Sequence, residues 1–321
     1  MKAVVVRQLG GPAVLRLEEV PAPAPGPGQV LLRVEAAGVN YADLLLRAGH
    51  YGDARPPLVP GLEAAGTVAA LGPGVTVYAA GDRVCGWVQA GYAEYAVADA
   101  AHLFPLPPGL AAADAAAFPT AFGTAWHALA SLAGLQPGQT ALVHAAGSGV
   151  GAAALQLARR LSARTIATST QHWKLERARA LGCDLGVDTR ADTWPAAIAA
   201  ALGARAVNVA LEGVGRATLS GTIECMAHGG RIVLYGAPSG RRATIDLLAL
   251  IWRGITLRGS YLQGDPEFPA TARALAAEIL PALARGELSA SVDRVLPLAD
   301  APLAHRLLEE RQVFGKLVLV P

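Results

Sequence analysis

The sequence is poor in cysteine, and its few cysteines are scattered. Cys85, Cys183 and Cys225 are the three in a chain of 321 residues. Disulfide frameworks and zinc modules both place cysteines in regular, closely spaced sets. Neither pattern is present, so we expect no disulfide scaffold and no cysteine-rich zinc site. The expected role of all three thiols is that of small buried hydrophobic groups.

Net charge and long apolar runs are also scarce. The formal net charge is +2, which gives no electrostatic case for binding nucleic acid or an anionic membrane. Charges, proline or glycine interrupt the alanine-rich stretches near 111–135 and 196–211, so no membrane span is expected. The start of the chain, residues 1–7, has no long apolar region of the signal-peptide kind and is typical of a strand. We therefore expect a cytoplasmic protein.

Apolar residues, by contrast, are abundant. Hydrophobic residues make up 53% of the chain and charged residues 16%, enough to bury a large core, and the length predicts two domains. Up to about residue 120, short alternating segments separated by turn-rich stretches favour a small β-rich barrel. The strands expected there are 2–7, 14–20, 29–38, 63–71 and 92–97.

The most informative segment is an apolar run that meets a glycine-rich turn and then a helix. Residues 142–145 lead into Ala146, Gly147, Ser148, Gly149, Val150 and Gly151, and an apolar-periodic helix follows. Glycines let the backbone approach a dinucleotide pyrophosphate, and the N–H groups of the helix N-terminus face its negative charge. The alternative is a plain connection between a strand and a helix.

The segments after this turn favour the dinucleotide interpretation. They alternate between strands and helices at the spacing of a doubly wound parallel sheet. The expected elements are strand 164–168, helix 172–181 ending at Gly182, strand 206–211, strand 231–236, helix 266–284, strand 292–296, helix 300–310 and strand 315–319. The fold class is therefore α/β, and the last part of the chain is expected to rejoin the first domain.

Several short motifs, taken in order, resemble those of a known family. They are Gly38 to Leu44, Pro60 to Gly66, Gly81 to Val84, Gly91 to Tyr95, Ala145 to Gly151 and Gly315 to Leu319. The chain resembles the zinc-independent quinone oxidoreductase (ζ-crystallin-like) branch of the medium-chain dehydrogenase/reductase superfamily. The resemblance implies a GroES-like catalytic domain of residues 1–122 and 263–321. It also implies a Rossmann nucleotide-binding domain of residues 123–262, and a homodimer or homotetramer with 255–261 as a candidate edge strand.

The catalytic zinc ligands of the superfamily's alcohol dehydrogenases are missing. Asn40, Leu62 and Thr120 stand at or near the places of their cysteine, histidine and cysteine, and the remaining Glu63 cannot build a zinc site alone. Without a Lewis acid nothing stabilises the alkoxide of an alcohol. A quinone or an activated alkene delocalises the charge it receives with hydride, so a few hydrogen-bond donors suffice.

The resemblance therefore implies an NADPH-dependent quinone reductase that uses no metal. Its nearest rival reduces the C=C bond of an enone, a 2-alkenal or an enoyl thioester. A less favoured interpretation is a non-catalytic protein, either RNA-binding or structural like a lens crystallin. No basic patch or aromatic platform supports RNA binding.

Three residues are candidate hydrogen-bond donors to the quinone or alkene that accepts the hydride, namely Asn40, Tyr41 and Tyr51. For Asn40 the alternative is a turn residue at a strand end, and for the tyrosines it is an ordinary half-buried aromatic. Asp43 is expected to cap the following helix or to hold Arg47 at i+4, which is a structural role.

The end of the second strand of the nucleotide domain predicts NADPH rather than NADH. An NAD site normally has an acidic residue here on the ribose 2′-hydroxyl, whereas this chain has Thr168, Ser169, Thr170 and then Lys174, which suit a 2′-phosphate. The alternative for Lys174 is a solvated lysine. Many relatives have a tyrosine near the position of Thr189 that meets the 2′-phosphate end of the cofactor. The sequence leaves open whether Arg190 replaces this contact, because the charge of Asp188 would oppose it.

The resemblance adds further cofactor contacts at Asn40, Thr124, Gly213, Tyr235, Gly236 and Lys316. Thr124 has the alternative of a helix-start residue. Tyr235 and Gly236 could equally form a strand-end turn, and Lys316 could be a surface lysine.

Overall fold

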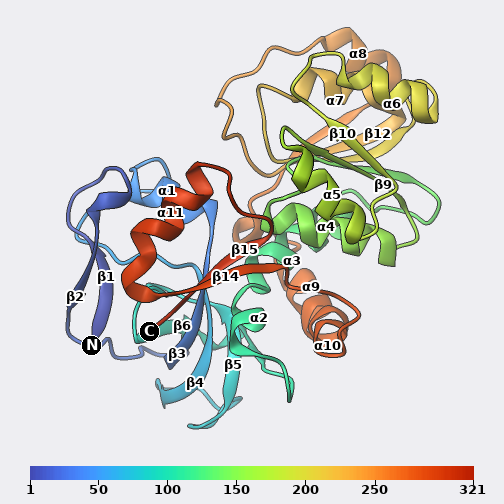
Figure 1. Cartoon of the computed structure of the whole chain (residues 1–321). Coiled ribbons are helices and arrows are strands. Elements are labelled where there is room, and N and C mark those ends of the chain that lie inside the picture. The colour runs from blue at the N-terminus through green and yellow to red at the C-terminus, as the bar shows by residue number, and fades with distance from the viewer. The chain divides into compact units, whose positions relative to one another are not determined.

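The computed structural model describes all 321 residues, which form two compact units interleaved along the chain. The first unit comprises residues 1–120 and 276–321, and the second comprises 121–275. No helix combines the length and apolarity that a membrane crossing requires. The α/β fold class predicted from the sequence is confirmed, with one sheet in each unit and a two-stranded ribbon in the first (Figure 1).

The first unit is built on a seven-stranded sheet. Its strands run β14-β15-β3-β4-β5-β7, with β6 also paired to β3, while β1 and β2 form a separate antiparallel ribbon. The bounds are β1 Lys2–Val6, β2 Leu15–Glu19, β3 Gln29–Val39, β4 Glu63–Leu71, β5 Arg83–Trp87, β6 Tyr95–Asp99, β7 Leu103–Pro105, β14 Val292–Pro297 and β15 Lys316–Val320. Much of β3 alternates between buried and less buried residues, because one face of the sheet packs on the core that contains Leu32 and Leu317.

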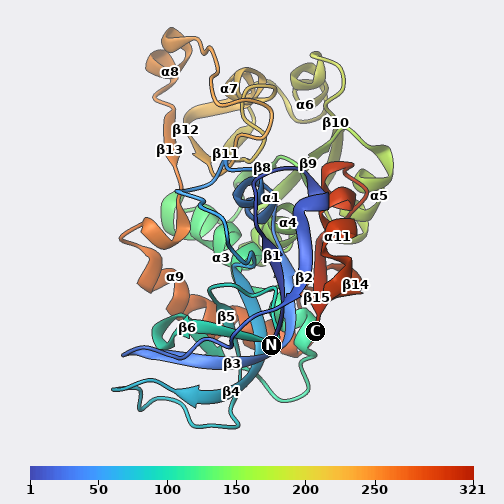
Figure 2. The ribbon, with the colours of Figure 1, turned by 90° about the vertical axis from the view of Figure 1, so that its left-hand side faces the viewer.

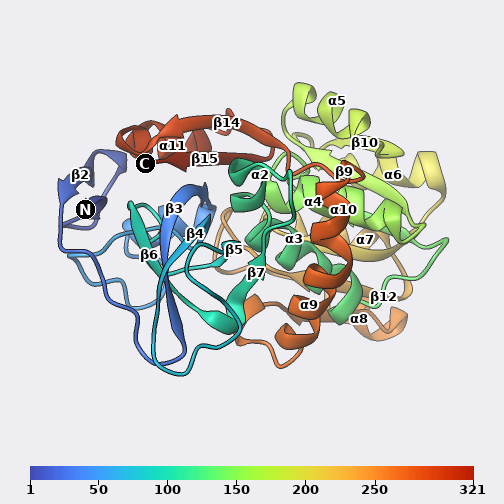
Figure 3. The same cartoon turned by 90° about the horizontal axis from the view of Figure 1, so that it is seen from below.

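The last strands of the chain complete this sheet. In Figure 3, β14 and β15 run as neighbouring strands, and they pair in parallel. β15 also pairs antiparallel with β3, with Leu317 opposite Val39. The helices of the first unit are α1 Tyr41–Arg47, α2 Ala112–Ala116, α10 Leu280–Ala284 and α11 Ala301–Glu309, and α3 Pro119–Trp126 crosses the boundary between the units.

The second unit is a doubly wound parallel sheet. Its strand order is β10-β9-β8-β11-β12-β13, which is the 3-2-1-4-5-6 order of dinucleotide-binding folds. Helices α4 and α5 cover one face and α6, α7 and α8 the other (Figure 1). The bounds are β8 Thr140–Val143, α4 Gly149–Arg160, β9 Arg164–Ser169, α5 His172–Ala180, β10 Leu185–Asp188, α6 Trp194–Leu202, β11 Val207–Glu212, α7 Leu219–Cys225, β12 Met226–Leu234, α8 Leu247–Arg253, β13 Thr256–Gly259 and α9 Phe268–Ala274.

The segment 263–275 belongs to the second unit, whereas the sequence analysis assigned it to the first. The expected helix 266–284 is in fact α9, a π-helical turn and α10, and the boundary lies at the start of that turn. The Thr271 hydroxyl lies 2.9 Å from His127 Nδ1 and 3.0 Å from Ser131 Oγ. These buried polar contacts attach α9 to the second unit, and the sequence pattern alone does not reveal them.

Candidate active site and nucleotide-binding edge

The glycine-rich turn joins β8 to α4 as a tight strand-to-helix connection. Ser148 is the N-cap of α4, and its hydroxyl accepts a hydrogen bond of 3.0 Å from the N–H of Gly151. A side chain at Gly151 would collide with the carbonyl oxygen of Ala145, so only glycine lets the helix start this close to the strand. This is the close packing that a pyrophosphate-binding turn requires.

Lys174 lies across this turn. A Cβ atom at Gly147 would come within 2.5 Å of Lys174 Cδ, which shows that the lysine stem covers Gly147. Its Nζ is 5.3 Å from the centre of the Trp173 ring. At the end of β9 the Ser169 hydroxyl accepts from the N–H of Gln171 at 3.1 Å, and Thr170 is exposed. The structure thus brings Ser169, Thr170 and Lys174 to the strand end beside the turn.

The ends of β11 and β12 meet at the same edge. A Cβ atom at Gly213 would collide with the Tyr235 hydroxyl, and one at Gly236 would come 3.1 Å from the Gly213 carbonyl oxygen. Tyr235 also hydrogen-bonds with the Ser148 side chain, and burial raises the pKa of its phenol. Gly213, Tyr235 and the glycine-rich turn therefore converge at the carboxyl edge of the parallel strands, where such sheets bind ligands.

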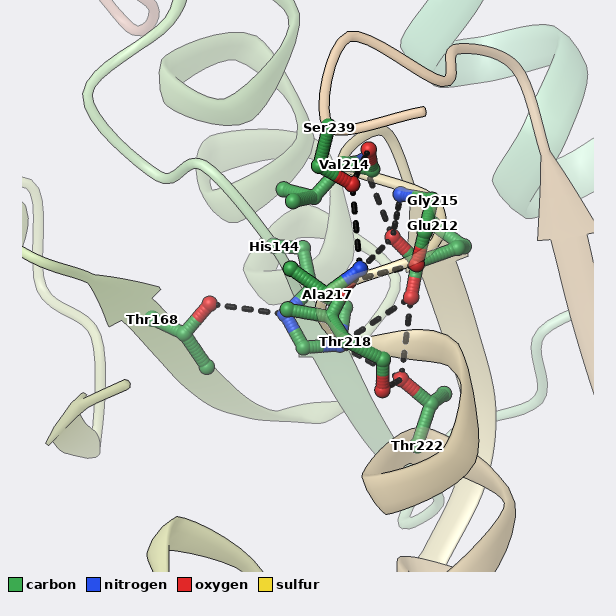
Figure 4. Close-up of polar contacts among 9 residues, drawn as sticks. All are labelled: His144, Thr168, Glu212, Val214, Gly215, Ala217, Thr218, Thr222 and Ser239. Carbon is green, nitrogen blue, oxygen red and sulfur yellow. Dashed lines mark hydrogen bonds and ion pairs between the residues drawn. The ribbon is translucent and has the colours of Figure 1, made fainter. Parts of the chain in front are cut away.

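A buried polar network that no local sequence motif predicts lies behind this edge (Figure 4). Glu212 is fully buried, and its Oε1 accepts from the N–H groups of Val214 and Gly215, each at 2.9 Å, and from the Thr218 hydroxyl at 2.8 Å. Its Oε2 accepts from the Thr222 hydroxyl at 3.0 Å. The carboxylate therefore fixes the backbone that follows β11. In the sequence, the one sign of this network is a glutamate, Glu212, at the end of an apolar strand segment.

His144 connects Glu212 to β9. Its Nδ1 lies 2.8 Å from the Thr168 hydroxyl and its Nε2 lies 2.8 Å from the Thr222 hydroxyl. Burial lowers the pKa of the imidazole, with Glu212 opposing, so the ring is neutral near pH 7. Because Thr222 donates to Glu212, it accepts from His144 Nε2–H, and Nδ1 accepts from Thr168. The hydroxyl of Thr168, a predicted cofactor contact, is buried and bonded within this network.

The first unit gathers a second set of polar groups at the ends of β3, β4 and β15. Asn40 Nδ2 donates to Glu63 Oε1 at 2.8 Å, and Lys316 Nζ donates to Asn40 Oδ1 at 2.7 Å and to Glu63 Oε1 at 2.5 Å. The Thr120 N–H donates to Glu63 Oε2 at 2.7 Å. Glu63 and Lys316 are buried, with 0% and 4% of their side chains exposed. The surface-lysine alternative for Lys316 is therefore wrong, and its cofactor role gains no support from this placement.

Asp43 holds the start of α1, as the sequence analysis expected. It accepts from the N–H of Asn40 at 2.8 Å, from the N–H of Gly61 at 3.1 Å and from the Tyr92 hydroxyl at 3.1 Å. The expected alternative, a contact with Arg47, is not made. Arg47 pairs with Glu309 on α11 instead.

The stability of the protein should depend on the ionisation of Asp43. Burial raises the pKa of this carboxyl from 3.8 to about 6, although its three donors and the Lys316 charge oppose the shift. The folded state then retains a proton that the unfolded state loses, so the free energy of unfolding falls as pH rises from about 4 to about 6. The full effect is about 3 kcal/mol.

Chemical denaturation of the wild type and of Asp43→Asn across this pH range measures the effect. The variant lacks the titrating group, so the stability of the wild type relative to the variant should decline with rising pH. A constant or rising difference would contradict the assignment.

The other predicted residues are placed as follows. Tyr41 is 47% exposed, while Tyr51 and Thr124 are half-buried. Arg190 forms an ion pair of 2.6 Å with Asp188. The guanidinium that would replace the relatives' tyrosine is therefore bound to a neighbouring carboxylate. The three cysteines are buried and unbridged, as predicted. No group of three or more histidine, cysteine, aspartate or glutamate side chains is arranged to hold a metal ion.

Comparison with known proteins gives consistent matches over both units. Residues 26–108 match the family model described as alcohol dehydrogenase GroES-like domain, and 149–278 match the model described as zinc-binding dehydrogenase. The chain is 32% identical to 2-haloacrylate reductase of Burkholderia sp, covering 99% of this chain and 98% of that protein. It is 31% identical to quinone oxidoreductase of Sus scrofa, covering 100% and 98%.

Other matches extend the range of relatives. Polyketide synthase GfsB of Streptomyces halstedii is 38% identical over 91% of this chain, which spans only 5% of that protein. The solved structure of quinone oxidoreductase from Thermus thermophilus, also described in complex with NADPH, is 36% identical, with a TM-score of 0.86 and full coverage of both chains. A solved structure of an NAD-dependent alcohol dehydrogenase is also 36% identical, with a TM-score of 0.91 and full coverage of both.

Proposed function

The chain belongs to the medium-chain dehydrogenase/reductase superfamily of oxidoreductases, and from this premise we propose that it is an NADPH-dependent quinone reductase that works without zinc. The observation that carries the proposal is the pairing of two features. One is a nucleotide edge with a lysine across its glycine-rich turn. The other is Asn40, an amide donor, in place of a zinc ligand.

The second unit has the features that NADPH requires. The turn at Gly147 to Gly151 lets the backbone approach a pyrophosphate, and β9 ends in Ser169 and Thr170 instead of a carboxylate. The Lys174 ammonium supplies a charge for the 2′-phosphate. When bound, the nicotinamide supplies hydride from its C4 atom. The protein residues bind and orient the dinucleotide, with Tyr235 and Gly213 at the same edge of the sheet.

The first unit supplies a hydrogen-bond donor for the quinone that receives the hydride. Hydride transfer places negative charge on the oxygen of a quinone, and an amide N–H directed at that oxygen stabilises the charge. Asn40 carries such an N–H, and Glu63 and Lys316 hold its side chain. The chain has no cysteine or histidine at position 40 or 62 to ligate zinc, so the acceptor must already be electrophilic.

A second candidate function is reduction of an activated C=C bond by the same residues. One relative favours it, the 2-haloacrylate reductase, because the substrate in its name is an activated alkene. The charge that forms on the carbonyl oxygen of an enone or thioester during hydride addition resembles that on a quinone, so Asn40 would serve both reactions.

Turnover of NADPH with a panel of acceptors tests both candidates. The panel contains 1,4-benzoquinone, 9,10-phenanthrenequinone, a 2-alkenal and crotonyl-CoA, with added zinc as a control. Turnover restricted to quinones and unaffected by zinc supports the first function. Turnover restricted to the alkenal or the thioester moves the assignment to C=C reduction, and no turnover of any acceptor contradicts both.

Removing the Lys174 charge should abolish the preference for NADPH. We expect Lys174→Ala to raise the Kd for NADPH by about tenfold to a hundredfold, because a charge-assisted contact contributes about 1.5–3 kcal/mol. The Kd for NADH should change little. Fluorescence titration with both nucleotides measures this, and Lys2→Ala, at an exposed lysine, is the control. An equal loss for both nucleotides would count against the 2′-phosphate role.

We also propose that two copies associate through the β13 edge of the nucleotide sheet. β13 is the terminal strand of its sheet (Figure 2), as predicted for 255–261. All four of its residues are exposed. Leu247, Ile251 and Trp252 on the nearby α8 are between 63% and 73% exposed. Such an apolar surface beside an unpaired strand suits a symmetric interface.

A further inference from the structure

We propose that Lys316 and Glu63 are positioning residues that lock the amide of Asn40, so that the site offers an N–H and not a carbonyl to the acceptor. This inference rests on the proposed function, because it concerns the residue assigned to the acceptor. It also defines the substrate class more closely, as compounds that place a hydrogen-bond-accepting oxygen at Asn40.

The sheet register brings the three residues together. Asn40 follows β3 directly, and Glu63 and Lys316 are the first residues of β4 and β15. β3 lies between β4 and β15, with Val39 opposite Leu317 and Ala37 opposite Ala64. Their side chains therefore meet although 276 residues separate Asn40 from Lys316 along the chain.

The charges of the two neighbours determine the orientation of the amide. An ammonium group only donates and a carboxylate only accepts, so Lys316 requires the amide oxygen and Glu63 requires the amide nitrogen. Both contacts are made, at 2.7 and 2.8 Å. A flipped amide would place donor against donor and acceptor against acceptor, inside a region where both charges are buried. The orientation of Asn40 is therefore fixed at both ends of the amide, at its oxygen and at its nitrogen.

The Glu63 carboxylate is itself held in place. Its second oxygen accepts from the Thr120 N–H, and a Cβ atom at Gly38 would collide with Oε1. The carboxylate thus packs directly on the β3 backbone at Gly38. Asp43 restrains Asn40 from the other side by accepting from its backbone N–H. The amide is preorganised before any acceptor binds, which is the condition for effective stabilisation of a developing charge.

One amide hydrogen remains for the acceptor. Asn40 Nδ2 carries two hydrogens, and one of them is used by Glu63. The Thr120 hydroxyl, next to the N–H that binds Glu63, is buried without a hydrogen-bond partner. A carbonyl or carboxylate oxygen of a ligand can accept from such donors, whereas a ligand that offers only N–H or O–H donors finds no acceptor on the Asn40 amide.

A double-mutant cycle between Lys316→Met and Asn40→Ala tests whether Lys316 acts through Asn40. In the wild-type background, Lys316→Met should lower kcat by about tenfold or more, because the amide can then flip away from the acceptor. The Kd for NADPH should stay within about twofold. In the Asn40→Ala background, the same change should lower kcat by less than about twofold further.

Two further variants separate positioning from folding. Lys316→Met alone leaves the Glu63 charge buried without its partner and is expected to weaken the fold. The charge-balanced pair Glu63→Gln with Lys316→Met should recover the denaturation midpoint but not kcat. Lys2→Met, at an exposed lysine, is the control for a lost lysine charge. Equal losses of kcat from Lys316→Met in both backgrounds would overturn the proposal, as would a large increase in the Kd for NADPH.

The cycle also has a readout without turnover. If the wild type reduces no acceptor, the proposed function fails, but the denaturation midpoints of the four proteins still report the coupling between Lys316 and Asn40. Non-additive shifts are expected for two residues in contact. Additive shifts would show that Lys316 does not act on the Asn40 side chain.

Discussion

Gly151→Ala is expected to destabilise the nucleotide unit by about 3 kcal/mol or more and to abolish tight binding of NADPH. The added methyl group would collide with the Ala145 carbonyl oxygen and lie 2.8 Å from Ala146 Cα. Both are backbone atoms, so the helix and the strand must separate to accept the change. Overpacking of this kind is costly because the neighbours cannot rotate away.

Gly147→Ala is the matched variant. The three atoms nearest to its added methyl group all belong to the Lys174 stem, which can move by rotation. We expect a loss of stability below about 1 kcal/mol, with a selective loss of NADPH affinity as the lysine is displaced. Chemical denaturation and nucleotide titration of both variants measure the two effects. Equal destabilisation by the two substitutions would contradict the assigned packing.

Glu212→Leu should be similarly severe for a different reason. The change leaves the backbone N–H groups of Val214 and Gly215 without their buried acceptor, whereas the Thr222 and Thr218 hydroxyls keep carbonyl oxygens at 2.9 and 3.4 Å. Each unsatisfied group costs about 1–3 kcal/mol, so a total of about 4 kcal/mol is expected. The loop after β11 should also lose its fixed conformation, which would weaken nucleotide binding at the neighbouring Gly213.

Glu212→Gln is the control for this prediction. It retains one oxygen acceptor at nearly the same shape, so it should lose about half as much stability or less. Denaturation midpoints of the two variants, and protection of the Val214 and Gly215 amides from hydrogen exchange, report the outcome. If Glu212→Leu left these amides protected, the carboxylate would not be what fixes the loop.

The sequence predicted the elements with strong local patterns and missed those defined by buried polar contacts. The alternation in 29–38 and the glycine-rich turn at 146–151 led directly to β3 and α4, because periodicity and turn chemistry are local properties. The placement of 263–275 was misjudged because it depends on Thr271 meeting His127, which lies 144 residues away along the chain.

The candidate site divides in the same way. Asn40 and the glycine-rich turn belong to short motifs, so the sequence alone singles them out as candidates. Thr168 is one of the small hydroxyl residues expected near the 2′-phosphate, and its hydroxyl lies 2.8 Å from His144 Nδ1, a contact that no local pattern reveals. The sequence predicts a cofactor contact or a surface lysine at Lys316, because no local pattern reveals a partner such as Glu63. Long-range pairing of charges can be recognised only once the sheet register is known.

The pairing of β15 with β3 has a consequence for how the chain is made. A ribosome releases β3 and β4 early, yet the strand that supplies Lys316 follows only after the entire nucleotide unit. Until then the edge of β3 near Asn40 lacks its neighbour, and the Glu63 charge lacks its cation. Domains generally fold in order of synthesis, but the sheet of the first unit can be completed only after the second unit has been made. Until β15 has been made and has paired with β3, the polar groups around Asn40 lack the contacts that order them.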